Sequence, residues 1–168
     1  VWATDSKTYV STMSSNDFFS NEKSSTLRAD QAGKARIEIV AKDGSVTILG
    51  TGIQYHSGTV VDATFMSAKA LSAFLTQQYA STKNNDVLFS IHLKATMMKV
   101  SDPIIFGHAV KAYLEPVFSQ YAKDLADVGA NPNSGMGSVL ESIAGSPKAN
   151  EIMVAVNTAI DTNPPLYM

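Results

Sequence analysis

The period of the hydrophobic pattern changes after residue 66, and this change constrains the fold more than any other feature of the sequence. Over residues 36–48, apolar and polar residues alternate on both sides of Asp43-Gly44, and a further extended run covers residues 59–65. Alternation of this kind predicts strands. Asp-Gly between two such runs is typical of a two-residue hairpin turn, because both residues then need positive φ.

Helical spacing follows. Ser67 can cap a helix whose apolar residues recur at i, i+3, i+4 and i+8, and residues 83–86 should end it. Residues 87–93 predict a mostly buried strand. Its second face becomes polar toward the carboxyl end, where His92 and Lys94 lie.

The last third of the chain predicts helices. Asp102 reads as an N-cap with Pro103 at the first helical position, where the missing N–H is tolerated. Pro116 should kink or split this helix. After a loop rich in glycine and asparagine, a short helix is expected around residues 139–143, and another should run from Ser146-Pro147 to about residue 160.

These elements indicate an α/β fold, with a mixed, partly antiparallel sheet and helices packed on it. A chain of 168 residues with 45% apolar content is long enough for one domain or part-domain with a core. We divide it into residues 1–66, mainly short strands, loops and a hairpin; residues 67–128, with a helix, a strand and a helix; and residues 129–168, which are helical.

The composition excludes several classes of partner. The chain has 13 Lys and Arg against 15 Asp and Glu. It therefore lacks the basic excess that nucleic acid or an anionic membrane surface would require. No apolar stretch reaches the roughly 18 residues that a spanning helix needs. The absence of cysteine suits a reducing compartment, and we expect a cytoplasmic location.

The candidate site is the stretch HLKATMMKVSDP, residues 92–103. It joins the carboxyl end of the predicted strand to the start of the next helix, and ligands gather at the carboxyl ends of strands in open α/β sheets. The helix N-terminus favours an anion, and Lys94 and Lys99 add positive charge. The pattern therefore suggests a site for an acidic small molecule.

Each polar residue here also has an ordinary structural explanation. Lys94 and Lys99 can be solvated surface charges, and Asp102 is explained as an N-cap. Four further expectations are structural: hydrogen-bonded histidines at His92 and His108, core methionines at Met97 and Met98, no assigned chemistry for Ser101, and a solvated face for Asp124 and Asp127.

A resemblance to a known family is carried by LFSIHLKATMMKVSDPIIFGHAVKAY, residues 88–113. This stretch resembles a segment of the monomeric-type NADP-dependent isocitrate dehydrogenases, which are large single-chain bacterial enzymes. Three further stretches are similar to the same family in the same order: DSKTYVSTMSSNDFFSNEKS, ARIEIVAKDGSVTIL and VVDATFMSAKAL. The similarity covers essentially the whole chain and is looser after residue 122.

The resemblance implies an activity and one catalytic residue. The family oxidises isocitrate with NADP and a divalent metal, Mg or Mn, and decarboxylates the product to 2-oxoglutarate. The first lysine of its HLKATMMKV motif is catalytic, which here is Lys94. The substrate-gripping, metal-binding and NADP-binding residues lie outside these 168 residues.

The chain is therefore expected to be an internal piece of the family's large domain, and its two ends look like cuts. No cofactor is expected on the piece alone, and the piece alone should be inactive. The alternative is a non-catalytic domain that binds a small anion or acts as a scaffold.

Overall fold

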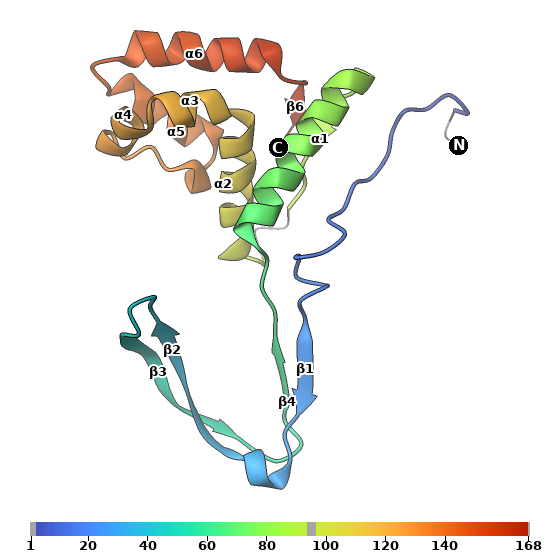
Figure 1. Ribbon diagram of the computed structural model, residues 1–168, viewed down its shortest axis with the longest axis vertical. Helices are drawn as coiled ribbons and strands as arrows, with labels where there is room; N and C mark the ends of the chain where they lie inside the picture. Colours follow the sequence, from blue (N-terminus) through green and yellow to red (C-terminus); the bar gives the residue numbers. More distant parts are fainter. Residues whose placement is uncertain (1–2, 94–96, 168) are drawn as a thin grey trace. The chain divides into compact units, whose positions relative to one another are not determined.

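The computed structural model describes residues 3–93 and 97–167 (Figure 1). The chain divides into two compact units. One unit is Ser15–Met66, and the other combines Val1–Ser14 with Ser67–Met168. None of the helices in the described ranges is long and apolar enough to cross a membrane.

The unit Ser15–Met66 consists of two antiparallel strand pairs. Its elements are β1 (Lys23–Thr26), a 3-10 helix (Ala29–Gln31), β2 (Gly33–Val40), β3 (Val46–Tyr55) and β4 (Val60–Ala63). β1 pairs with β4, and β2 pairs with β3. None of the described residues of this unit is fully buried. These strands therefore have no hydrophobic core of their own.

The hairpin around Asp43-Gly44 is confirmed, but its turn is longer than predicted. The Ala41 N–H donates to the Ser45 carbonyl at 2.9 Å, so residues 42–44 form the loop. Gly44 has a φ of 83°, whereas Asp43 is not among the residues with positive φ. The two-residue turn was the wrong prediction, because a three-residue loop requires left-handed backbone at only one position.

The second unit is mostly helical. Its elements are α1 (Ala68–Asn85), β5 (Phe89–Ser90), α2 (Ser101–Tyr113), α3 (Glu115–Gln120), α4 (Ala122–Asp127), a 3-10 helix (Pro132–Ser134), α5 (Met136–Ala144), α6 (Ala149–Thr162) and β6 (Leu166–Tyr167). Its largest fully buried side chains are aliphatic and come from α2, α3, α5, α6 and the α2–α3 junction: Val110, Leu114, Val117, Val139, Ile143, Ile152 and Val156. Each contributes roughly 1.5–3 kcal/mol by burial, so this cluster is the main core.

Both boundaries of the first predicted helix and the effect of Pro116 are confirmed. The Ser67 hydroxyl accepts a hydrogen bond from the Ala70 N–H at 3.3 Å, and Asp86, with a φ of 53°, closes α1. Pro116 splits the predicted second helix into α2 and α3. The last helix starts at Ala149, later than predicted, because Ser146 lies in the preceding turn and Lys148 is the N-cap.

The α/β class with both strand orientations is confirmed. The described strands form three two-stranded sheets, of which β5–β6 is parallel and the other two are antiparallel. The sequence did not predict β6. Its two residues are extended because they pair with β5, and a stretch this short carries no periodic pattern of its own.

Gly107 marks a close contact between α2 and the 3-10 helix Pro132–Ser134. A Cβ atom on Gly107 would lie 1.8 Å from Asn133 Oδ1 and 3.0 Å from the Asn133 backbone nitrogen. Glycine inside a helix is about 1 kcal/mol less favourable than alanine. The close approach of Asn133 explains why glycine nevertheless occupies this position.

Gly107→Ala should therefore lower the free energy of unfolding of the 168-residue chain by about 1–3 kcal/mol, the typical effect of overpacking, as measured by urea denaturation. The control is Gly137→Ala in α5, where no atom lies within 4 Å of the new Cβ. It should raise the free energy of unfolding by about 0.5–1 kcal/mol. Equal effects of the two substitutions would contradict the contact.

Candidate functional site

The candidate site lies at the carboxyl end of β5. Backbone hydrogen bonds hold this strand to the end of the chain, from the Phe89 N–H to the Pro165 carbonyl at 2.8 Å and from the Ile91 N–H to the Tyr167 carbonyl at 2.9 Å. The predicted alternation over residues 87–93 is confirmed, because odd-numbered residues are half-buried and even-numbered ones exposed. The prediction of a mostly buried strand is wrong, since among the described residues β5 pairs with β6 alone.

Three aromatic rings anchor β5 to the helices. We call Tyr79, Phe89 and Tyr113 the aromatic junction. The Tyr79 ring meets the Phe89 ring edge-on at a centroid distance of 4.7 Å and the Tyr113 ring at 5.3 Å. Edge-to-face pairs of this kind contribute about 0.5–1.5 kcal/mol beyond burial. The junction therefore joins α1, α2 and β5.

The two tyrosine hydroxyls of the junction donate to backbone carbonyls. Tyr79 Oη donates to the Ala109 carbonyl at 3.1 Å, and Tyr113 Oη donates to the Pro164 carbonyl at 2.9 Å. Burial raises the pKa of both phenols, because the charged form is poorly solvated there. Both hydroxyls are therefore neutral donors at physiological pH, and the Tyr113 bond ties the segment leading into β6 to α2.

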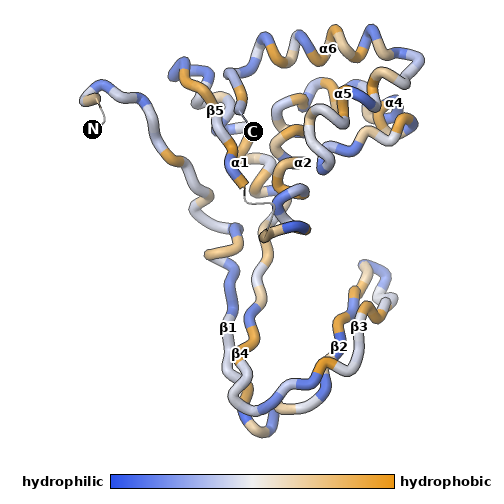
Figure 2. The backbone as a smooth tube through the Cα atoms, turned by 180° about the vertical axis from the view of Figure 1, so that it is seen from behind, coloured by the Kyte–Doolittle hydropathy of each residue, from blue (hydrophilic) through white to orange (hydrophobic). Residues whose placement is uncertain are grey.

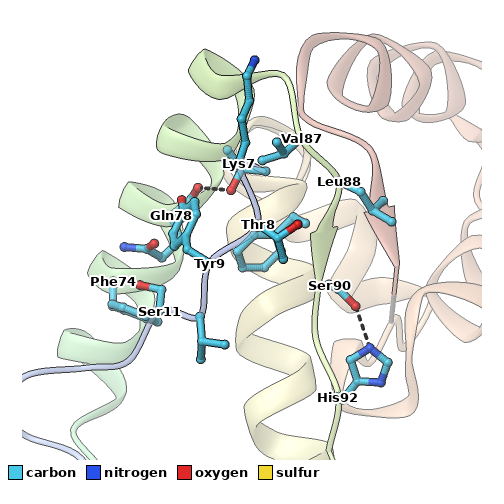
Figure 3. Close-up of a pocket in the computed structure, with 13 residues that line it drawn as sticks. Lys7, Thr8, Tyr9, Ser11, Phe74, Gln78, Val87, Leu88, Ser90 and His92 are labelled. Atoms are coloured by element: carbon cyan, nitrogen blue, oxygen red, sulfur yellow. Dashed lines mark hydrogen bonds between the residues drawn. The ribbon is translucent and has the colours of Figure 1, made fainter. Parts of the chain in front are cut away.

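Beyond β5 the chain carries polar side chains. His92 is exposed, and its Nε2 lies 2.7 Å from the Ser90 hydroxyl, as the dashed line in Figure 3 shows. The His92 ring also lies 5.7 Å from the Tyr167 ring. Lys94, the predicted catalytic residue, lies outside the described residues. Lys99 is exposed.

Asp102 differs from its prediction as an N-cap. α2 already begins at Ser101 with Val100 as its N-cap, so Asp102 lies within the first helical turn. Its side chain is only 4% exposed, and its Oδ2 has no hydrogen-bond partner among the described residues. A carboxylate in the first turn complements the helix dipole. Asp102 therefore places an acidic side chain at the helix end where the sequence suggested that a free anion would bind.

A groove of about 700 Å³ lies beside β5 (Figure 3). Its walls come from the N-terminal segment, α1 and the β5 stretch: Lys7, Thr8, Tyr9, Val10, Ser11, Phe74, Gln78, Thr82, Val87, Leu88, Phe89, Ser90 and His92. Lys7 Nζ donates to the Asn85 carbonyl at 3.1 Å, and Tyr9 Oη lies 3.2 Å from Ser81 Oγ. These contacts hold the N-terminal segment against α1.

The sequence did not identify the N-terminal wall of this groove. Residues 7–11 form no helix or strand, and the only local signal was the apolar pair Tyr9-Val10. Their place beside α1 depends on contacts with residues more than 70 positions later in the chain. No periodic pattern reports such contacts.

The remaining sequence expectations have mixed outcomes. Both histidines are hydrogen-bonded as predicted, His108 through Nδ1 at 3.3 Å from the Ser72 hydroxyl. The prediction of core methionines is wrong, because Met97 and Met98 are exposed. Asp127 is exposed and pairs with Lys123, and half-buried Asp124 pairs with Lys148 at 3.0 Å. These ion pairs raise the pKa of both lysines through hydrogen bonds to the carboxylates.

The described residues do not form a metal site. No group of three or more His, Asp or Glu side chains lies close enough together to hold a metal ion within residues 3–93 and 97–167.

Polar side chains between the end of a strand and the start of a helix are typical of ligand sites in α/β enzymes. Comparison with known proteins identifies the family of this chain. The family model of monomeric isocitrate dehydrogenase matches residues 1–168. The chain is 47% identical over 167 residues to the isocitrate dehydrogenase [NADP] of Corynebacterium glutamicum, covering 99% of this chain and 22% of the relative. It is also 44% identical over 167 residues to that of Corynebacterium efficiens, with 99% and 23% covered. For isocitrate dehydrogenase [NADP] 2 of Colwellia maris the identity is 40% over 169 residues, with 99% and 22% covered.

This chain belongs to the monomeric isocitrate dehydrogenase family, and the resemblance inferred from the sequence is confirmed. The chain spans about a fifth of the length of these relatives. The matched region includes the whole stretch from β5 to α2.

Proposed function

We propose that this chain is the lysine-bearing part of a longer polypeptide that oxidises isocitrate with NADP and decarboxylates the product to 2-oxoglutarate. The observation that carries the proposal is the match of the whole chain, residues 92–103 included, to relatives named isocitrate dehydrogenase [NADP]. The relatives are bacterial. A cytoplasmic location is part of the proposal, since it suits a chain without cysteine.

Lys94 is the residue to which we assign chemistry. Oxidation at C2 of isocitrate sends a hydride to the nicotinamide and releases the proton of the C2 hydroxyl. An amine beside that hydroxyl can accept the proton, and an ammonium there can stabilise the developing oxyanion. Partial burial or a nearby cation lowers a lysine pKa and favours the first role.

The anchoring of β5 supports this assignment. The strand that leads to Lys94 is held by its ladder with β6 and by the aromatic junction. Catalytic groups require placement to within a fraction of an ångström of their working geometry. β5 is held in these two ways, and its last residue, Ser90, precedes Lys94 by four positions in the sequence.

NADP and Mg or Mn belong to the proposed whole enzyme. When bound, they supply the hydride acceptor and a Lewis acid. The described residues of this chain do not fit the metal, because they bring together no set of metal ligands. We place the metal and cofactor sites in the remainder of the polypeptide and assign this chain the proton transfer at Lys94.

The 168-residue chain alone should show no isocitrate-dependent reduction of NADP, because one lysine cannot bind substrate, metal and cofactor together. The assay follows NADPH absorbance with Mg or Mn added, and far-UV circular dichroism verifies that the chain is folded. The complete polypeptide serves as the positive control. Robust turnover by the 168-residue chain would refute our placement of the metal and cofactor sites in the rest of the polypeptide.

Lys94→Met in the complete polypeptide should lower kcat by at least about 100-fold, the usual range for loss of a general acid or base. KM for isocitrate should change by less than about threefold, because the amine acts mainly in the transition state. Lys99→Met is the matched control, since Lys99 is an exposed lysine of the same stretch. It should retain the kcat of the unaltered enzyme.

An unchanged kcat in Lys94→Met would end the catalytic role of this lysine. If the complete polypeptide itself lacked isocitrate-dependent NADP reduction, the alternative of an anion-binding or scaffold domain would replace the enzyme.

A further inference from the structure

The β2–β3 hairpin exposes aliphatic side chains in the half next to its turn. We call these residues the apolar ribbon: Ile37, Ile39, Val40, Val46, Ile48 and Leu49. Each is between 52% and 63% exposed. Figure 2 shows hydrophobic segments along both strands. Scattered apolar residues on a surface are ordinary, but a continuous patch marks a contact surface.

The apolar ribbon has two faces. Directly paired residues of an antiparallel ladder point to the same side. The pairs Val40–Val46 and Glu38–Ile48 therefore share one face. Ile37 and Ile39 occupy the other face, because neighbouring residues of a strand alternate.

A hairpin with this pattern is not stable as an isolated element. Both faces of the hairpin carry exposed aliphatic side chains, and the face with Val40, Val46 and Ile48 also carries the Arg36–Glu38 pair. Aliphatic side chains on both faces of a sheet favour a cover on both sides. A lone two-stranded hairpin is marginal in water. Within the described part of the chain, β2 and β3 pair only with each other, so the outer edge of each strand also offers free N–H and carbonyl groups.

The charges on the hairpin are compatible with an apolar cover. Arg36 and Glu38 form an ion pair with each other. The pair balances its own charge and leaves the aliphatic side chains as the dominant chemistry of the surface. The expected partner is therefore an apolar one and not a charged ligand.

The length of the relatives indicates what covers the ribbon. The match to the Corynebacterium glutamicum enzyme includes 99% of this chain but only 22% of that protein, so such a polypeptide has ample further chain. A second copy of this chain is less suitable. A twofold contact would cover one face of each hairpin and leave the other face in water.

We propose that the apolar ribbon is a docking arm, covered on both faces by the remainder of the longer polypeptide. This inference rests on the proposed function only in requiring that longer polypeptide, and it is independent of Lys94. In this arrangement, the remainder of the polypeptide provides one apolar layer against each face of the hairpin.

Amide hydrogen exchange tests the proposal. Amides of residues 36–40 and 46–49 should exchange on the order of 100-fold more slowly in the complete polypeptide than in the 168-residue chain. At about 1.4 kcal/mol per tenfold, this equals about 2.8 kcal/mol of protection. Equally fast exchange in both proteins would show that nothing docks.

Slow exchange already in the 168-residue chain would also overturn the proposal. If that protection disappeared on dilution, a second copy would be the occupant. If it persisted, residues of this same chain would be the cover.

Two substitutions test the two faces separately in the complete polypeptide. Ile39→Asp and Ile48→Asp should each remove the protection of the hairpin amides, because each places a charge against one apolar layer. Lys42→Asp in the turn is the control and should leave the protection intact. If only one of the two substitutions had an effect, the second layer would be absent and the two-faced docking would be wrong.

The outcome is separable from the catalytic proposal. NADP reduction is measured on the same samples. If NADP reduction is lost while the hairpin amides stay protected from exchange, the result bears on the catalytic proposal. If the hairpin amides lose their protection, the result bears on the docking arm.

Discussion

The packing of Tyr79 against Phe89 and Tyr113 is the interaction on which the candidate site depends. β5 has only two residues in regular ladder geometry and pairs only with β6 among the described residues, so backbone pairing alone gives it little support. The aromatic junction adds a contact between this short strand and two helices. The hydroxyl of Tyr113 also fixes the segment that provides β6. A local cluster of rings thus holds the strand that leads to Lys94.

Much of the helical architecture was predictable, because it depends on local chemistry. Ser67 caps α1 and Pro116 separates α2 from α3 for reasons visible within a few residues. The partners of each element were not predictable in the same way. The parallel pairing of β5 with Leu166–Tyr167 and the contact of Lys7 with Asn85 join residues far apart in the sequence. Asp102 shows a further limit, since α2 starts two residues earlier than predicted and a solvated cap becomes a buried acidic side chain.

The two units differ in how completely they bury their own hydrophobic residues. The helical unit buries a cluster of aliphatic side chains completely, whereas the strand unit buries none of its described residues. Relatives in the family contain several times more chain than the matched region. Under the two proposals above, the exposed aliphatic residues of β2 and β3 would pack within that longer polypeptide, and Lys94 would take part in its chemistry.

The most direct test of the aromatic junction is a double-mutant cycle in the 168-residue chain. The free energy of unfolding is measured for the unaltered chain, for Tyr79→Leu, for Phe89→Leu and for the double substitution. The junction predicts a coupling free energy of about 0.5–1.5 kcal/mol between the two rings. Additive effects, with a coupling below about 0.3 kcal/mol, would show that β5 is not anchored through these rings.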